Sequence, residues 1–341
     1  MTDQLKKYLF EDRTVRVQAV RLSDTWRDAQ AHHAYTPAVR KLLGELIAAS
    51  TLLAANIKFD GSLLLQIQGD GPISLVVVEC KMEPPRSPSS LPPEGAASGL
   101  GRPGAAGDLS LRATVKVREG QAVPEDGTLQ SLLNAHGTGR FVVLLDPKRK
   151  TPGQQAYQGI VPLEGETVAQ VLEHYMKSSE QLDTRMWLAA DGQNAAGFLV
   201  QRLPDQGGRS GEMANAAAVD TAAADADAWN RATQLAGTLE AGELLATDID
   251  TLIHRLYRDE TLLVFDPQDV RWHCPCGRGR VADMLRMLGR AEVESILAEQ
   301  GQVQVSCDFC GKPYLFDAVD CAGLFAAVAP LADMQHPPTM H

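Results

Sequence analysis

The chain has 341 residues, which is too many for one ordinary core and indicates two or three domains. Its 43 acidic residues outnumber its 32 basic residues and give a formal net charge of -11, so the molecule should repel phosphate backbones and we expect no nucleic-acid partner. The N-terminal residues lack the apolar region of a signal peptide, and no apolar run approaches the ~20 residues that span a bilayer. We therefore expect a cytoplasmic protein without a membrane partner.

The first 204 residues predict a domain that mixes strands and helices. A Gly69-Asp70-Gly71 turn between two apolar runs is typical of a hairpin. Because the elements do not alternate strictly, the pattern favours an α+β domain over a doubly wound sheet. Strands are expected at 15–20, 62–68, 73–80, 111–117, 141–145, 157–162, 186–190 and 197–203, and helices from residue 23 and at 36–56 and 166–178.

Two segments differ from this domain in composition. Residues 84–108 are rich in proline, glycine and serine and predict a disordered surface insertion. Residues 205–260 predict a helical linker that begins with an alanine-rich stretch and includes a helix opened by Thr247, with Asp250 at the capping-box position. Since alanine buries little apolar area, we expect this linker to have low stability and to depend on packing against its neighbours. A plain interdomain linker is the simpler alternative.

Four of the six cysteines form two close pairs in a predicted C-terminal module, residues 261–325. Cys274 and Cys276 lie in HCPCGRG, Cys307 and Cys310 lie in SCDFCGK, and thirty residues separate the pairs. Tetrahedral zinc takes four thiolate sulfurs, and two tight turns that each present two sulfurs can supply them. We therefore predict one zinc ion per chain on these four cysteines.

The predicted module is small, and a tail at 326–341 follows it. With so few apolar residues it should depend on zinc binding, which contributes roughly 10 to 16 kcal/mol in comparable peptides. A C-x-C pair can also oxidise to a small, strained disulfide ring, so the same sulfurs could act as ligands or as a redox couple. The expected elements are a strand at 270–273, helices at 281–288 and 291–299, and a strand at 303–306.

Several other roles for the module stay open. It could be a permanent zinc knuckle, or it could contact nucleic acid, although it lacks repeated fingers and an aromatic stacking stripe. A thioredoxin-like role is disfavoured because no βαβ frame surrounds Cys307-x-x-Cys310. Positive charge near thiols lowers their pKa and favours oxidation. The arginines that could act in this way are Arg271, Arg278, Arg280, Arg286 and Arg290.

The remaining candidates are weaker. His273 could replace a thiolate ligand, but four sulfurs already complete a tetrahedron. Cys80 closes an apolar run and is interpreted as a small buried hydrophobe, whereas Cys321 lies close enough to the cluster to interfere in its oxidation. No catalytic constellation can be singled out, so we do not expect an enzyme.

The sequence resembles a known family over most of its length. The run FDPQDVRWHCPCGRG and the later EVESILAEQGQVQVSCDFCGKPYLFD are similar to the C-terminal redox switch of the bacterial 33-kDa chaperonin family, a group of heat-shock holdases. Upstream similarity is carried by KFDG, QGDGP, YQGIVPLEGET, SEQLDTR and HRLYRDE. The insertion at 84–108 and the long alanine-rich stretch depart from the family pattern.

The resemblance implies a mechanism. Reduced protein would hold zinc and be inactive, and oxidants would convert Cys274 with Cys276 and Cys307 with Cys310 to disulfides, with release of zinc. The switch and linker would then unfold, and exposed apolar surface would bind unfolding client proteins without ATP, with the active form tending to be a homodimer. A constitutive zinc-stabilised interaction protein, which never cycles, is the alternative. Candidate client-binding residues are Leu239, Leu244, Leu245, Ile249, Leu252 and Leu256, whose simpler role is core packing.

Overall fold

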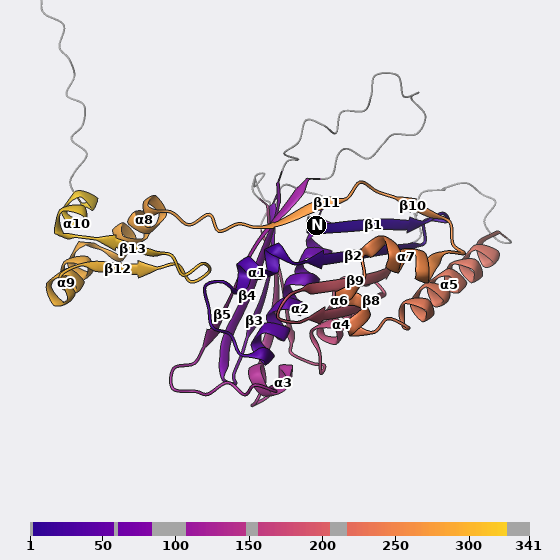
Figure 1. The fold of residues 1–341 in the computed structure, drawn as a ribbon, viewed down its shortest axis with the longest axis horizontal. Coiled ribbons are helices and arrows are strands. Elements are labelled where there is room, and N and C mark those ends of the chain that lie inside the picture. Colours follow the sequence, from indigo (N-terminus) through magenta and orange to yellow (C-terminus); the bar gives the residue numbers. More distant parts are fainter. Residues whose placement is uncertain (1–2, 58–60, 84–106, 148–155, 205–216, 326–341) are drawn as a thin grey trace, which may run out of the picture. The chain divides into compact units, whose positions relative to one another are not determined.

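The computed structural model of the chain forms two compact units, Met1–His273 and Cys274–His341 (Figure 1). The predicted insertion at 84–108 lies outside the described residues except for its last two positions, and the predicted tail at 326–341 lies wholly outside them. The residues that the structure describes are 3–57, 61–83, 107–147, 156–204 and 217–325.

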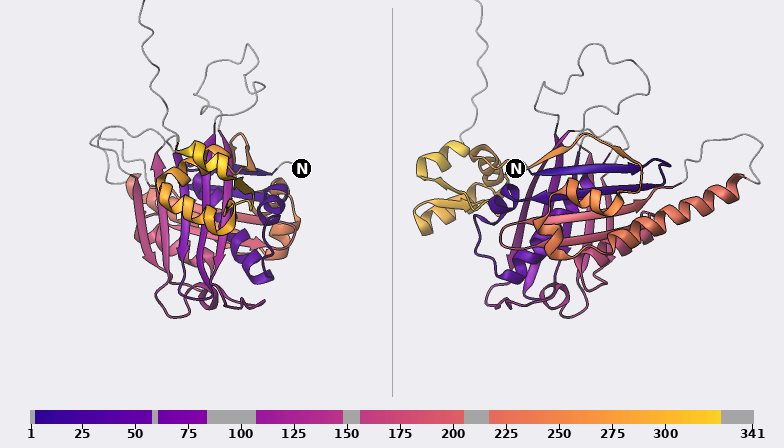
Figure 2. Two further views of the ribbon diagram at one scale, coloured as in Figure 1. Left: turned by 90° about the vertical axis from the view of Figure 1, so that its left-hand side faces the viewer. Right: turned by 45° about the vertical axis from the view of Figure 1, so that its right-hand side comes forward.

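An 11-stranded sheet forms the frame of the first unit (Figures 1 and 2). All neighbouring strands are antiparallel except β11 and β5, and the predicted hairpin between β3 and β4 is confirmed. The expected α+β class is confirmed as well. In spatial order the strands are β7 (Tyr157–Pro162), β6 (Arg140–Pro147), β3 (Gly61–Gln68), β4 (Ile73–Glu83), β5 (Asp108–Val117), β11 (Gln268–Trp272), β1 (Gln4–Phe10), β2 (Val15–Leu22), β9 (Ala195–Arg202) and β8 (Thr184–Ala190), with β10 (Leu262–Val264) also beside β1.

The main core lies on one face of this sheet. Side chains alternate along a strand, so Leu63, Leu65 and Ile67 of β3 all point into this core. The long helix α2 packs across the strands, and a Cβ at its Gly44 would lie 2.4 Å from the Cβ of Ala190, so only glycine fits this close approach. The helices of this part of the unit are α1 (Asp24–Gln30), α2 (Pro37–Ala54), α3 (Leu129–Leu133) and α4 (Val168–Ser178).

A second core lies on the other face of β1, β2, β9 and β8. Alternation places Val15 and Val17 of β2 in this core, whereas Val20 and Leu22 belong to the main core. The helices that cover it are α5 (Ala217–Ala236), α6 (Ala241–Ala246) and α7 (Ile249–Tyr257). The described part of the predicted linker is therefore helical, as expected, and forms a layer on the sheet.

The start of α7 differs from the prediction. Asp248 is its N-cap, and the carboxylate of Asp248 accepts a hydrogen bond from the backbone N–H of Thr251 at 2.9 Å. Thr247 instead ends α6. A carboxylate at the N-cap accepts a hydrogen bond from a backbone N–H that has no partner within the helix, and its negative charge interacts favourably with the helix dipole. Both effects favour the aspartate over the threonine at this position.

The boundary between the units also differs from the prediction. Strands β10 and β11 pair with β1, and β11 pairs with β5, so they belong to the sheet of the first unit. The N–H of Val270 donates to the carbonyl of Asp3, and the hydroxyl of Thr25 donates to the carbonyl of Val270. Because these backbone groups are satisfied by the sheet, the second unit begins at Cys274 and not at residue 261.

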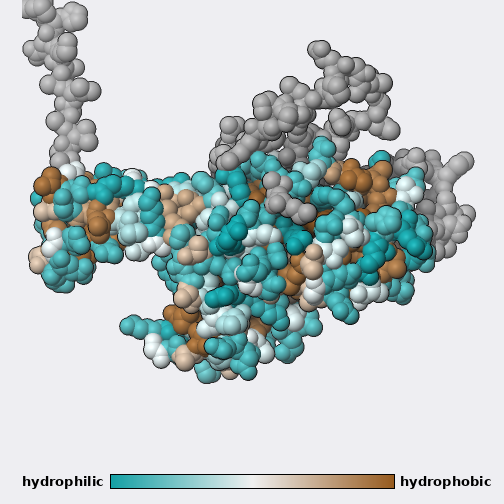
Figure 3. Space-filling model, viewed as in Figure 1, coloured by the Kyte–Doolittle hydropathy of each residue, from teal (hydrophilic) through white to brown (hydrophobic). Residues whose placement is uncertain are grey.

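The second unit has a small core built from two short strands and three helices. The expected helices and the second expected strand are present, and the structure adds β13 and α10. Figure 3 shows apolar side chains on its surface. Met287 and Val319 are among its exposed large apolar residues. Its elements are α8 (Arg278–Leu288), α9 (Arg290–Gln300), β12 (Val303–Ser306), β13 (Pro313–Phe316) and α10 (Ala318–Leu324).

Candidate metal centre

A tight hairpin presents the second cysteine pair. The last paired residues of strands β12 and β13 are Ser306 and Pro313, so Cys307 and Cys310 both lie in the connecting loop. The N–H of Cys307 donates to the carbonyl of Lys312 at 3.0 Å, and the N–H of Gly311 donates to the carbonyl of Cys307 at 2.8 Å. Gly311 has φ 64°, a left-handed conformation that glycine adopts without steric cost.

The first cysteine pair lies directly before α8. Cys274 begins the second unit, and Cys276 precedes the first residue of α8, Arg278, by two positions. The N-terminal end of a helix carries partial positive charge, which favours a thiolate over a thiol nearby. The local sequence thus places both pairs where the backbone is turning and places the first pair beside the N-terminal end of a helix.

The four sulfurs lie within 4.8 Å of one another. The Sγ atoms of Cys274 and Cys307 are 3.6 Å apart, those of Cys276 and Cys310 are 3.3 Å apart, and all four residues are free thiols. A tetrahedral ion with ligands at about 2.3 Å requires sulfurs about 3.8 Å apart, so the arrangement fits zinc. Among the described residues, this group contains the four predicted cysteines and excludes His273.

The protonation of the cluster is uneven. Burial raises the pKa of Cys274 to about 12, and hydrogen bonds to the neighbouring thiols act in the same direction. Burial also acts to raise the pKa of Cys276, but hydrogen bonds from the Tyr314 hydroxyl and the other thiols outweigh it and lower that pKa to about 7. The same contact with Cys276, followed by burial, raises the pKa of Tyr314 to about 12. The cluster therefore favours negative charge on Cys276.

No arginine is among the groups that shift the pKa of Cys274, Cys276 or Cys310. Arg278 pairs with Asp320 at 2.6 Å and lies over the ring of Phe316, which ties the start of α8 to β13 and α10. Arg286 pairs with Asp283 and Arg290 pairs with Glu294. At Cys276, the hydrogen bond from the Tyr314 hydroxyl lowers the thiol pKa, an effect that the sequence analysis had expected from arginines.

Comparisons with known proteins bear on these observations. The family model described as Hsp33 protein matches residues 3–317. The 33 kDa chaperonin of Methylobacillus flagellatus is 42% identical over 339 residues, which cover 98% of this chain and 99% of that protein. The chain belongs to the Hsp33 family. A 33 kDa chaperonin of Chromobacterium violaceum is 40% identical over 323 residues, which cover 95% of this chain and 94% of that protein.

A solved member of the Hsp33 family has the same fold. The crystal structure of the 33 kDa chaperonin, heat shock protein 33 homolog, from Thermotoga maritima matches with a TM-score of 0.70 at 19% identity and covers 95% of this chain and 98% of its own. Membership of a family whose curated relatives are named chaperonins supports a chaperone role. In the described part of the chain, no helix combines the length and apolar character needed to cross a membrane.

The two other cysteines of this Hsp33-family chain are buried. Cys80 is fully buried in β4, and burial raises its pKa to about 12, which confirms its interpretation as a small hydrophobe. Cys321 lies in α10 and is 3% exposed, within the core of the second unit. Burial raises its pKa too. The folded module thus keeps Cys321 protonated and away from solvent.

The candidate client-binding residues lie in the second core. Leu252 and Leu256 are buried against the sheet, and Leu245 is partly buried against the same cluster. All six residues therefore have the packing role that the sequence left as the simpler alternative. Any binding role requires the α5–α7 layer to move.

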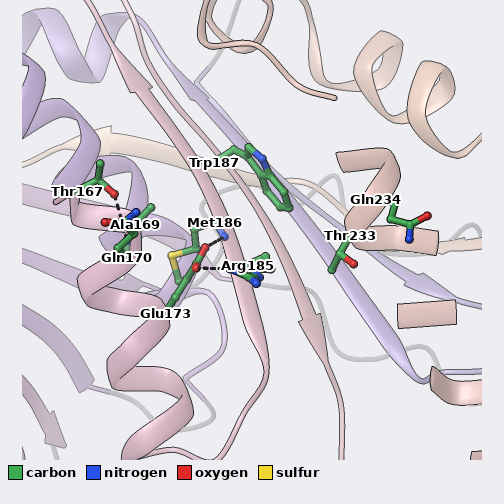
Figure 4. Close-up of a pocket in the computed structure, with 9 residues that line it drawn as sticks. All are labelled: Thr167, Ala169, Gln170, Glu173, Arg185, Met186, Trp187, Thr233 and Gln234. Carbon is green, nitrogen blue, oxygen red and sulfur yellow. Dashed lines mark hydrogen bonds and ion pairs between the residues drawn. The ribbon is translucent and has the colours of Figure 1, made fainter. Parts of the chain in front are cut away.

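Two surface pockets lie along the edge of this layer. A pocket of about 490 Å³ lies where α4, β8 and α5 meet, and its lining includes Glu173, Trp187 and Thr233 (Figure 4). A second pocket of about 300 Å³ is lined by residues of α2, β8 and α6, including Glu45 and Leu244. Both pockets border α5 or α6, so the edge of the helical layer lines surface grooves.

Proposed function

We propose that this protein is a cytoplasmic, redox-regulated, ATP-independent chaperone that holds unfolding proteins and prevents their aggregation. The observation that carries the proposal is the convergence of four free thiols within 4.8 Å, two from the start of a small module and two from its β12–β13 hairpin. Family membership supports the chaperone part of the proposal. The thiol geometry supports the redox part.

The reduced, inactive state is proposed to hold zinc on Cys274, Cys276, Cys307 and Cys310. When bound, zinc would supply a cross-link between the loop before α8 and the β12–β13 hairpin. The module needs such a cross-link because its core is small and most of its helical surface is exposed. Its buried residues are Ala282, Leu285, Val293, Val303, Tyr314, Phe316 and Cys321.

Oxidation by a peroxide is proposed to remove the ligands. One thiolate attacks a peroxide oxygen, the O–O bond breaks, and hydroxide leaves to give a sulfenic acid. The second thiolate of the pair attacks that sulfur and releases a second hydroxide as the S–S bond forms. Disulfides between Cys274 and Cys276 and between Cys307 and Cys310 leave no thiolate to coordinate an ion. The module then unfolds, and dithiol reductants reverse the reaction.

Loss of the module is proposed to free the helical layer of the first unit. Cys274 follows β11 closely, and β10 and β11 connect α7 to the module along the chain. Three buried residues of α5 are alanines, Ala228, Ala232 and Ala236, and each buries little apolar area. Release of the layer would expose both its own leucines and the sheet face beneath it. This apolar surface would bind clients and would also allow homodimers of the oxidised form.

The test follows client aggregation and zinc together. Reduced protein is treated with warm peroxide and then with dithiothreitol, while light scattering reports aggregation of a thermally unfolding client and a chromogenic chelator reports zinc. We expect release of one zinc per chain and reversible, ATP-free suppression of scattering. Retention of zinc, or release without suppression, would instead favour a constitutive zinc-stabilised interaction protein.

Two variants sharpen this experiment. Cys276→Ser should lose zinc and redox control together, since it removes one of the four ligands. Cys80→Ala is the matched control because Cys80 is a buried thiol of β4 in the first unit. The control should respond to peroxide as the unsubstituted protein does. An equal loss of control in both variants would contradict the role of the cluster.

A further inference from the structure

Tyr314 makes a contact with the thiol cluster that the proposed function does not use. It lies in β13, where its backbone pairs with Val305 of β12, and only 6% of the residue is exposed. Its hydroxyl donates a hydrogen bond to the Sγ of Cys276 at 3.1 Å. The ring packs in the core of the second unit, which holds the hydroxyl in place.

This contact makes Cys276 different from the other three cysteines. The side chains of Cys274 and Cys310 interact with the other thiols of the cluster, and the shortest contacts are those between Cys274 and Cys307 and between Cys276 and Cys310. Cys276 alone among the described thiols of the cluster has a hydroxyl donor as well. A donor held against one ligand atom of a metal site is an outer-shell interaction, and such interactions orient the ligand and tune its electronic properties.

A hydrogen bond of this kind should slow oxidation of the sulfur. A cysteine that binds the metal is already a thiolate, so the hydrogen bond cannot speed oxidation there by increasing the thiolate fraction. The donor instead withdraws electron density from that thiolate, and its nucleophilicity falls as the charge becomes better stabilised. Attack on a peroxide transfers a sulfur electron pair to oxygen, so it weakens the hydrogen bond in the transition state. The same bond favours the thiolate as a ligand, because it stabilises charge without occupying the pair that binds the ion.

We propose that Tyr314 is a positioning residue that anchors the Cys276 thiolate and thereby sets how readily the cluster is oxidised. This inference rests on the proposed function. In the step that Tyr314 restrains, the Cys276 sulfur attacks a hydroperoxide, the O–O bond breaks, hydroxide leaves, and a sulfenic acid forms. The thiolate of Cys274 then displaces the second hydroxide. Two sulfurs lose one electron each, and the peroxide gains two.

A packing role alone would give a different result. A buried tyrosine hydroxyl needs an acceptor, and Cys276 could serve simply to satisfy it. In that case, removing the hydroxyl would change stability but not the electronic state of the sulfur. Spectra of the metal-loaded protein therefore separate the two roles, since charge-transfer bands report electron density on the thiolates.

The experiment compares Tyr314→Phe with Tyr175→Phe in the full chain. Both substitutions remove one hydroxyl from a buried ring, and Tyr175 donates instead to Glu180 at 2.7 Å in the first unit. Three quantities are measured on reduced protein: zinc affinity by competition with a chelator, the rate of zinc release by hydrogen peroxide, and the thiolate-to-cobalt charge-transfer absorption after loading with cobalt(II). A third variant with 4-aminophenylalanine at residue 314 restores a weaker donor.

For Tyr314→Phe we expect zinc affinity to fall and peroxide-driven zinc release to accelerate, each on the order of tenfold, with a shifted charge-transfer band. The 4-aminophenylalanine variant should lie between, and Tyr175→Phe should match the unsubstituted protein. An unshifted band with an unchanged release rate would overturn the inference. If Tyr314→Phe does not bind one metal ion per chain, the 4-aminophenylalanine variant is compared with the unsubstituted protein instead. An unshifted charge-transfer band with an unchanged rate of zinc release in that variant would likewise overturn the inference.

The outcome also distinguishes this inference from the proposed function. If peroxide releases no zinc from the unsubstituted protein or from Tyr175→Phe, the redox function fails. Zinc affinity and the cobalt spectrum would still report whether Tyr314 tunes the Cys276 thiolate. If peroxide releases zinc from all variants at the same rate, the redox function stands and the role of Tyr314 is refuted.

Discussion

Truncation of Leu252 in α7 should partly activate the reduced protein. Leu252 is 1% exposed and packs in the core between α5–α7 and the sheet. Replacement of a buried leucine by alanine costs about 2 to 5 kcal/mol through lost apolar burial and the cavity left behind. Since α7 is the part of the layer that loses this contact, most of the cost should fall on its docking to the sheet.

The size of the effect follows from this cost. If the opening of α5–α7 becomes about 3 kcal/mol easier, the open population rises on the order of 100-fold. Reduced, zinc-loaded Leu252→Ala should therefore suppress client aggregation without oxidant. Hydrogen exchange of the α7 amides should be faster by a similar factor, while the amides of α8 and α9 keep their protection.

Leu43→Ala is the matched control. Leu43 lies in α2, is fully buried, and belongs to the main core on the other face of the sheet. It loses the same methylene groups, so its global stability should fall by a similar amount. The reasoning is refuted if both variants gain equal activity in the reduced state. It is also refuted if Leu252→Ala opens α7 but binds no client.

Three further predictions concern metal, thiol and pH. Removal of metal from reduced protein by a strong chelator should abolish amide protection in α8–α10 but not in the β3–β4 hairpin, and protection that survives in α8–α10 would show a module independent of metal. Cys321→Ala should retain one zinc per chain and reversible peroxide response, because Cys321 is buried in the core and is not one of the four clustered cysteines; altered zinc stoichiometry would contradict this. Burial raises the pKa of Glu45 to about 7 despite the opposing charge of Lys41, so the native state holds this proton over a pH range where the unfolded chain has lost it. Stability should therefore decline as pH rises from about 4.5 to 7, and Glu45→Gln, followed by urea unfolding, should flatten this slope; an unchanged slope would exclude Glu45 as its source.

Local patterns predicted much of the fold. The apolar run after Thr36-Pro37 became α2, and the strands on each side of Gly69-Asp70-Gly71 became β3 and β4. Both depend on interactions between residues close in sequence, such as helical periodicity and turn geometry. The same holds for the helices at 278–288 and 290–300.

Long-range pairing explains what was missed. Strand β1 has mixed polar and apolar residues and becomes a strand because β2, β10 and β11 all pair with it. Strand β11 was assigned to the zinc module because of its nearness to Cys274. Its backbone partners in β5 are about 160 positions away in the sequence, a separation that no local pattern reveals.

The amino-acid sequence by itself identified the four candidate ligands, because four thiolates can complete a tetrahedral zinc site and the C-x-C and C-x-x-C turns can present them. It also indicated a weakly packed helical layer, because alanine has little apolar surface to bury. Only the tertiary structure placed the Tyr314 hydroxyl at 3.1 Å from Cys276, since β12–β13 pairing and core packing position that side chain. It also decided that β11 belongs to the sheet, because backbone hydrogen bonds to distant strands outweigh proximity along the chain.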